Sequence, residues 1–221
     1  MNDRLFHDRT EAGRRLAASL LRFKERKPVV LALPRGGVAV AAEVARALGA
    51  PLDVVLVRKI GAPYQPELAV GAVADGGRVE VALNPKVLRF VSPEWFEEEK
   101  ARQLAEIDRR RGLYLRGRPR AAVAGRTAIV VDDGIATGAT VRAALRSVRR
   151  AGPRRLVLAV PVAPRDTLAA LSGEVDEVVC LTTPEPFEAI GCYYGDFRQL
   201  DDDDVIRLLD EAAAPPDLGT P

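Results

Sequence analysis

The chain has 221 residues, of which 48% are hydrophobic, and this suffices for one α/β domain with a sizeable core. Its 33 basic and 31 acidic residues leave a net charge of +2, which argues against bulk electrostatic binding of nucleic acid. The two cysteines have no CxxC spacing and favour a reducing compartment. No signal segment and no long apolar stretch is visible, so we expect a cytoplasmic protein without a membrane partner.

Apolar spacing predicts alternating helices and strands in the first half of the chain. The expected elements are a helix over 8–25, a buried strand over 28–34, a helix over 38–48, a strand over 52–59, a loop over 61–68 and a hairpin over 69–83. Gly49 should end the second helix, and Asp-Gly-Gly should form the hairpin turn. The two prolines of 61–68 are the reason for expecting a loop there.

The second half continues the alternation. Its expected elements are a charged helix over 92–111, a strand over 126–133, a helix over 141–151, a strand over 154–163, a short helix over 165–171, a strand over 177–181 and a last helix over 201–213. Ser92 and Pro93 are typical of a helix start. The aromatic segment 183–200 should form a small hood, and residues 215–221 are expected to be disordered.

Five such strands predict a parallel sheet flanked by helices, in the flavodoxin-like order 2-1-3-4-5. We expect a single domain over 1–214, with an insertion over about 61–120. In this fold ligands bind beyond the carboxyl ends of the strands, where the strand order reverses between the first and third strands. The loops that follow those two strands, 34–37 and 132–140, should therefore meet at a ligand.

The loop in IVVDDGIATGAT combines residues that suit a phosphorylated sugar. It holds two acids, two glycines and two threonines: Asp132, Asp133, Gly134, Gly138, Thr137 and Thr140. The glycines, the threonine hydroxyls and the start of the next helix can bind a phosphate. Two acids would repel that phosphate unless sugar hydroxyls lay between, as in ribose 5-phosphate, and Mg²⁺ could bridge the remainder. Helix capping alone would need one aspartate, and no lysine follows the glycine as a P-loop requires.

VVDDGIATGAT resembles the 5-phosphoribosyl-1-pyrophosphate (PRPP) binding motif of type I phosphoribosyltransferases. The resemblance implies the corresponding fold and Mg²⁺ as cofactor. Asp132 and Asp133 would be catalytic residues and metal ligands. The 5-phosphate would be held by Gly134, Ile135, Ala136, Thr137, Gly138, Ala139 and Thr140.

Two further segments extend the resemblance. LPRGG resembles the pyrophosphate loop of the family, and VRK resembles its basic segment. The residues that would bind the pyrophosphate are Pro34, Arg35, Gly36, Gly37, Arg58 and Lys59. Lys59 would also be catalytic. The segment FEAIGCYYGDF resembles the hood that receives the base, with Phe187 stacking on it and Asp196 nearby.

The expected activity is transfer of the 5-phosphoribosyl group from PRPP to a nitrogenous base with release of pyrophosphate, as a pentosyltransferase of nucleotide metabolism. Ala136 stands where the 6-oxopurine enzymes carry an acid, so the acceptor stays open; Glu67 is the nearest match to the glutamate of the adenine enzymes. The prolines and glycines within 61–77 could form a lid. We expect a homodimer that binds small molecules and no nucleic acid. The alternative is a regulatory protein that binds PRPP or a nucleotide without turnover.

Overall fold

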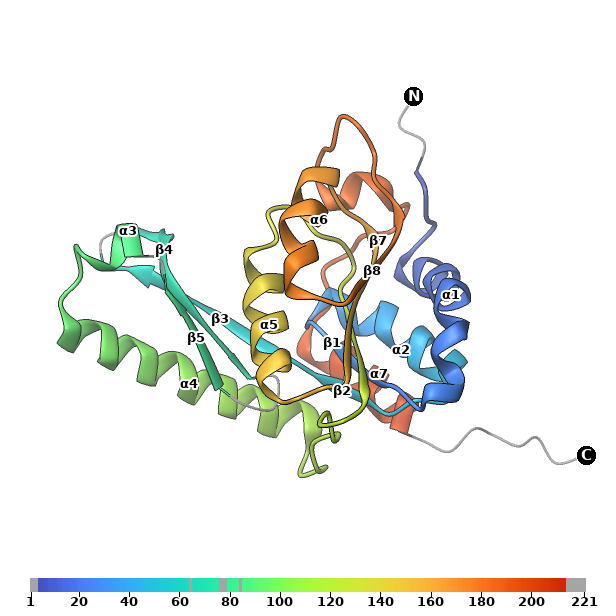
Figure 1. Ribbon diagram of the computed structural model, residues 1–221, viewed down its shortest axis with the longest axis horizontal. Helices are drawn as coiled ribbons and strands as arrows, with labels where there is room; N and C mark the ends of the chain where they lie inside the picture. Colours follow the sequence, from blue (N-terminus) through green and yellow to red (C-terminus); the bar gives the residue numbers. More distant parts are fainter. Residues whose placement is uncertain (1–3, 64, 76–78, 84, 214–221) are drawn as a thin grey trace, which may run out of the picture.

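The computed structural model describes residues 4–63, 65–75, 79–83 and 85–213 (Figure 1). It consists of a core built on a five-stranded sheet and an arm built on a three-stranded sheet. The segment 215–221, predicted to be disordered, lies outside the described residues.

The core sheet has the predicted order and is parallel throughout. Its strands are β1 (Val29–Ala32), β2 (Leu52–Val54), β6 (Thr127–Val131), β7 (Arg155–Val162) and β8 (Glu177–Thr182), arranged β2-β1-β6-β7-β8. Every residue of β1 and β6 is buried. Burial on both faces is why these strands are continuous apolar runs in the sequence.

Helices cover both faces of this sheet. They are α1 (Arg9–Leu20), continued by a 3₁₀ helix (Leu21–Arg26), α2 (Gly36–Leu48), α5 (Ala139–Arg150), α6 (Arg165–Leu171) and α7 (Asp202–Ala213). Alternate residues of the strands face opposite ways. Val30 and Ile129 pack with α1, α2 and α7, whereas Leu31 and Val130 pack with α5 and α6. Gly49 ends α2 as predicted, with φ +59°.

The prediction of one strand over 52–59 is wrong, because the segment forms two strands that belong to two different sheets. Its first half is β2, and after Val55, whose amide still donates to Ala32 O at 2.9 Å, the chain leaves as β3 (Leu56–Ala62). The predicted loop over 61–68 is also wrong: β4 (Gln65–Asp75) begins directly after a short turn. The pairing register shifts on both sides of Gly61, and such irregular positions are where an antiparallel ribbon tolerates proline.

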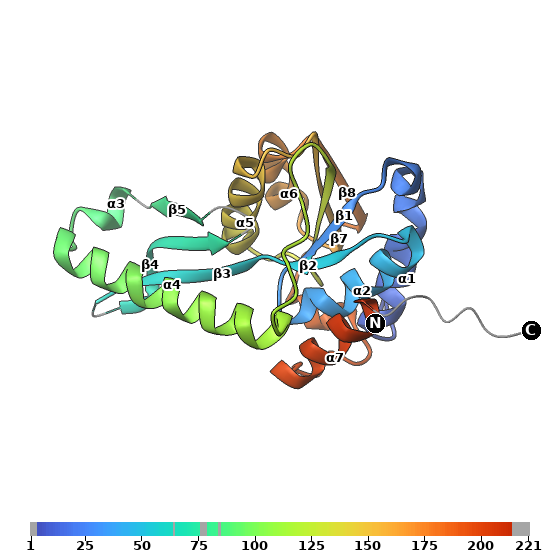
Figure 2. The same cartoon turned by 90° about the horizontal axis from the view of Figure 1, so that it is seen from below.

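The arm projects from one side of the core (Figures 1 and 2). It consists of β3, β4 and β5 (Val79–Leu83) in that order, followed by α3 (Pro85–Leu88) and the long helix α4 (Pro93–Leu115). The predicted hairpin is confirmed by the antiparallel pairing of β4 with β5, although its turn lies outside the described residues. The hydroxyl of Ser92 caps α4 by accepting from Trp95 N, and the helix runs past the predicted Arg111.

A buried ion cluster joins the arm to the core. Asp53 is 5% and Asp75 2% exposed, and Arg111 reaches both, with Nε 2.7 Å from Asp75 Oδ2. Arg120 Nη2 donates to the same Asp75 oxygen at 2.6 Å. Burial alone would raise the pKa of Asp75, but the hydrogen bonds and charges of Arg120 and Arg111 outweigh it and hold the pKa below its ordinary value.

Candidate functional site

The glycine loop, residues 34–37, packs against the two acids at the switch point of the sheet. A Cβ on Gly37 would lie 2.9 Å from Val131 O and 3.0 Å from Asp132 Oδ1. A Cβ on Gly36 would lie 1.9 Å from Asp133 Oδ2. Only glycine allows this approach, and the structure therefore brings the two predicted loops together. The peptide bond between Pro34 and Arg35 is cis.

The loop predicted to bind the 5-phosphate, residues 134–140 and called the phosphate loop below, leads directly into α5. Gly138 precedes the helix with φ +75°, a conformation that favours glycine. The loop is held from behind, since Ile135 N donates to Val162 O at 3.0 Å and Thr167 Oγ1 donates to Ala136 O at 2.9 Å. Thr137 is exposed. A helix start with its free amide groups and an exposed hydroxyl is suited to binding a phosphate.

The two acids of the motif have different environments. Asp132 Oδ1 accepts from Asp133 N at 2.9 Å, and the residue keeps part of its surface exposed. Desolvation raises the pKa of Asp132 well above its ordinary value, and the neighbouring Asp133 charge adds to this. Asp133, in contrast, is paired with Arg9, whose Nε lies 2.7 Å from Oδ2. Asp132 is therefore the acid that a cation or sugar hydroxyls would stabilise in its charged form.

Both acids were expected to bind Mg²⁺. The described part of the chain contains no group of three or more histidine, cysteine or acidic side chains that could hold a metal by itself. Mg²⁺ commonly uses one or two carboxylates together with substrate oxygens and water. Asp132, which keeps part of its surface exposed, could supply one such carboxylate, whereas Asp133 is committed to an ion pair.

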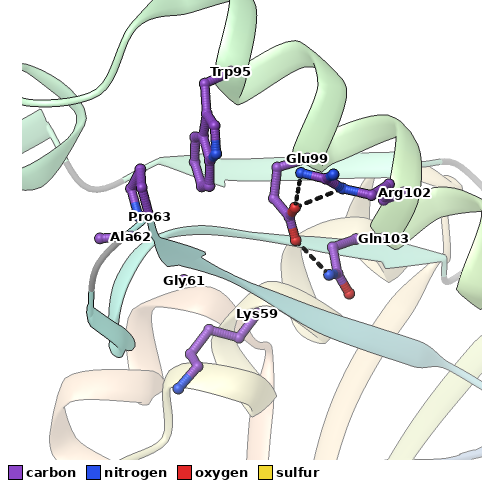
Figure 3. A pocket seen from close by; sticks show the side chains of 8 residues that line it. All are labelled: Lys59, Gly61, Ala62, Pro63, Trp95, Glu99, Arg102 and Gln103. Carbon is purple, nitrogen blue, oxygen red and sulfur yellow. Dashed lines mark hydrogen bonds and ion pairs between the residues drawn. The ribbon is translucent and has the colours of Figure 1, made fainter.

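The basic pair Arg58 and Lys59 lies on β3 in the arm. Arg58 Nε donates to Gln103 Oε1 of α4 at 2.9 Å. Lys59 borders a cavity of about 420 Å³ between β3 and α4, lined also by Trp95 and Glu99. Figure 3 shows its amine directed away from the Glu99 carboxylate. The structure thus places the pair beside α4, and the cavity that Lys59 borders is lined neither by the acids nor by the glycine loop. Glu67 lies in β4, and its side chain is outside the described part.

The hood begins beyond β8 and borders the phosphate loop. A crevice of about 910 Å³ is lined by Ala136 and Thr137 of the phosphate loop, by Arg165 and Thr167 of α6, and by Phe187 of the hood. The ring centroid of Phe187 lies 5.4 Å from that of Tyr193. The structure therefore brings Phe187 to the phosphate loop. The sequence did not indicate Arg165 and Thr167 as site residues. They reach the crevice because β6, β7 and β8 are neighbours in the sheet, which brings the segments after these strands together.

Asp196 lies elsewhere. It lines a different cavity, of about 310 Å³, together with Arg9 and Arg198. Its amide donates to His7 O at 2.7 Å, and Gly195 N donates to Phe6 O at 2.8 Å, so the N-terminal segment pairs with the hood. Asp196 and Phe187 therefore line two different cavities.

Arg9 and Tyr194 are site residues that motif reasoning missed. The hydroxyl of Tyr194 donates to Asp133 O at 2.5 Å. Arg9 and Tyr194 belong to no phosphate motif, but Arg9 lies on the buried face of α1 with Ala12 and Leu16. An arginine on the apolar face of an amphipathic helix was the available signal, because such a charge needs a buried partner.

The chain thus has a parallel sheet with the glycine loop, the two acids and the phosphate loop at its switch point. Comparison with known proteins assigns it to one family. It belongs to the family of the phosphoribosyl transferase domain, whose model matches residues 3–194. It is 50% identical over 212 residues to two Mycobacterium tuberculosis proteins, from strains CDC 1551 and H37Rv, each named "Putative phosphoribosyl transferase". The match covers 95% of this chain and 47% of each relative, so the chain spans about half their length.

A solved structure is similar over almost its whole length. The crystal structure of TT1426 from Thermus thermophilus is 50% identical, with a TM-score of 0.81 over 95% of this chain and 99% of that one. Among the described residues, none of the helices has the length and apolar character needed to cross a membrane.

Proposed function

We propose that this protein transfers the 5-phosphoribosyl group of PRPP to a nitrogenous base and releases pyrophosphate. The observation that carries the proposal is the contact of the glycine loop with the two acids, at the edge where α5 begins. Three segments that would together bind one ligand meet there. The phosphate loop would bind the 5-phosphate, Asp132 the ribose hydroxyls, and the glycine loop the pyrophosphate.

In the proposed reaction the bond from the anomeric carbon to pyrophosphate breaks as a base nitrogen attacks from the opposite face. Such a transition state resembles an oxocarbenium ion, so positive charge grows on the ribose. The carboxylate of Asp132 stabilises that charge, and Arg35 and the amides of the glycine loop stabilise the leaving group. Mg²⁺, bound through Asp132 and the substrate oxygens, would supply further charge neutralisation for the pyrophosphate.

The crevice beside the phosphate loop is the proposed acceptor site. It is large enough for a base, at about 910 Å³, and the ring of Phe187 borders it. Stacking of a flat heterocycle on an aromatic side chain contributes on the order of 1–3 kcal/mol. Arg165 and Thr167 add polar groups that would orient the base.

Binding of PRPP or a nucleotide without turnover is the second candidate. The observation that favours it is the position of Lys59, which lies in the arm beside α4 and borders a cavity that the acids do not line. A binding protein needs the phosphate and glycine loops but can dispense with a cation for the leaving group. We expect a homodimer in either case, and gel filtration with light scattering tests that expectation.

Two measurements separate the candidates. Titration calorimetry with PRPP and Mg²⁺ tests binding, and free ligand at a hundredfold excess over Kd should stabilise the fold by about 2.7 kcal/mol. Pyrophosphate release is then followed with purines, pyrimidines and ammonia as acceptors. Release with one acceptor establishes transfer, whereas binding without release from any acceptor favours the second candidate. No binding at millimolar PRPP would contradict both.

A further inference from the structure

A buried ion pair ties the N-terminal helix to the acid motif. The side chains of Arg9 and Asp133 are 10% and 12% exposed, and Nε lies 2.7 Å from Oδ2. Arg9 Nη1 also donates to Arg198 O at 2.9 Å, and its guanidinium carbon lies 3.9 Å from the ring centroid of Phe197. The hydrogen bonds to Asp133 and Arg198 and the contact of the guanidinium plane with the Phe197 ring together fix the position of this side chain.

Asp133 is in turn enclosed by segments from three parts of the chain. Arg9 approaches from α1, and Gly36 approaches so closely that a Cβ there would lie 1.9 Å from Oδ2 and 3.1 Å from Arg9 Nε. The hydroxyl of Tyr194, from the hood, donates to the main-chain oxygen of Asp133. The glycine loop therefore rests directly on the ion pair. A displacement of the Asp133 carboxylate would displace the glycine loop.

We propose that Arg9 is a positioning residue, which holds Asp133 so that the glycine loop and Asp132 keep the geometry that binds PRPP. This inference rests on the proposed function. It assigns different roles to the two acids: Asp132 contacts the ribose, and Asp133 joins α1, the glycine loop and the hood. Without Arg9 the buried Asp133 carboxylate would lose its counter-charge, a strongly unfavourable state that the loop can relieve by moving.

Three variants test this role. Arg9→Met removes the charge and keeps much of the side-chain volume. Arg9→Lys keeps the charge but cannot donate to Asp133 and Arg198 at once from a planar fork. Arg14→Met is the matched control, because Arg14 is on the same helix, is 71% exposed and pairs with Glu43 at 3.3 Å on the surface.

The decisive readout is a comparison of two ligands by calorimetry, each with Mg²⁺. Both ligands carry the 5-phosphate and the ribose hydroxyls, but only PRPP carries the pyrophosphate that the glycine loop would bind. We expect Arg9→Met to weaken PRPP binding about 10- to 100-fold, the range typical of residues that orient ligand-binding groups. Ribose 5-phosphate, which would use Asp132 but not the glycine loop, should lose clearly less affinity than PRPP in the same variant. Arg9→Lys should fall between Arg9→Met and wild type, and Arg14→Met should match wild type for both ligands.

Equal losses for both ligands, or unchanged PRPP binding in Arg9→Met, would overturn the positioning role. If Arg9→Met does not fold, Arg9→Lys decides the question, and unchanged PRPP affinity in that variant overturns the role. If wild type itself does not bind PRPP, the proposed function fails and the inference fails with it. If wild type binds and the Arg9 variants bind equally well, only the inference fails.

A double-mutant cycle tests the ion pair without any ligand. Arg9→Met and Asp133→Asn are compared singly and together in urea unfolding. We expect the double variant to be more stable than the sum of the two single losses predicts, because it leaves no buried charge unpaired. Strictly additive losses would show that the two side chains are not coupled, which overturns the proposal.

Discussion

Replacing Gly36 by alanine tests the contact on which the site depends. The added Cβ would lie 1.9 Å from Asp133 Oδ2 and 2.6 Å from Asp133 Cγ, far inside van der Waals contact. The carboxylate cannot easily retreat, because Arg9 holds it at 2.7 Å. Forcing an extra methyl group into a packed site typically costs about 1–3 kcal/mol. For a chain of this size each kcal/mol lowers Tm by about 2–4 °C, so we expect a loss of about 2–12 °C.

Thermal unfolding followed by circular dichroism measures this loss, and calorimetry measures PRPP binding at a temperature where the variant is folded. We expect PRPP affinity to fall, because the glycine loop and the acids can no longer approach. Gly112→Ala is the matched control: a Cβ there meets nothing within 4 Å, and the residue lies inside α4. Alanine should stabilise that helix by about 0.4–1 kcal/mol. A Gly36→Ala variant as stable as Gly112→Ala, with unchanged PRPP affinity, would refute the reasoning.

Three further predictions concern the acids, the acceptor crevice and the arm. Asp132→Asn should lower kcat about 10²- to 10³-fold with a smaller change in PRPP affinity, because its charge matters most when the ribose becomes cationic. Steady-state kinetics with an acceptor that supports pyrophosphate release measure this, and an unchanged kcat would contradict the role of Asp132. Phe187→Ala should raise KM for the base while PRPP affinity stays within about twofold, whereas a stability loss of about 3–5 kcal/mol would assign the ring to the core. The lowered pKa of Asp75 means that its contribution to stability is complete above the ordinary value of 3.8 and is lost as the pH falls through the folded-state pKa. Urea midpoints from pH 7 downward should therefore converge for wild type and Asp75→Asn below about pH 4, and a constant difference would contradict the ion cluster.

The core fold could be predicted because its information is local. Four of the five core strands are apolar runs bounded by charged residues, glycine or proline, and β1, β6 and β7 are each followed by a helix, so a parallel sheet was the consistent arrangement. The arm was predicted less well. LDVVLVRK is uniformly strand-forming, and nothing in it indicates that the chain changes sheets after Val55. That change depends on partners: Val54 pairs with Ala32 in the core, and Leu56 with Asp75 in the arm.

The site also combines features that depend on neighbouring residues with features that depend on distant ones. The sequence by itself predicted the loop 132–140 as one local unit, because a strand end, two acids, two glycines and a helix start are consecutive there. It also determined that the loop after β1 would meet this unit, since parallel strands present their carboxyl ends at one edge. Only the tertiary structure decided that Asp133 is committed to Arg9, 124 positions away, and that Arg58 and Lys59 lie beside α4. A buried charge takes its partner from whatever the fold places beside it, and that choice depends on packing between distant segments rather than on neighbouring residues.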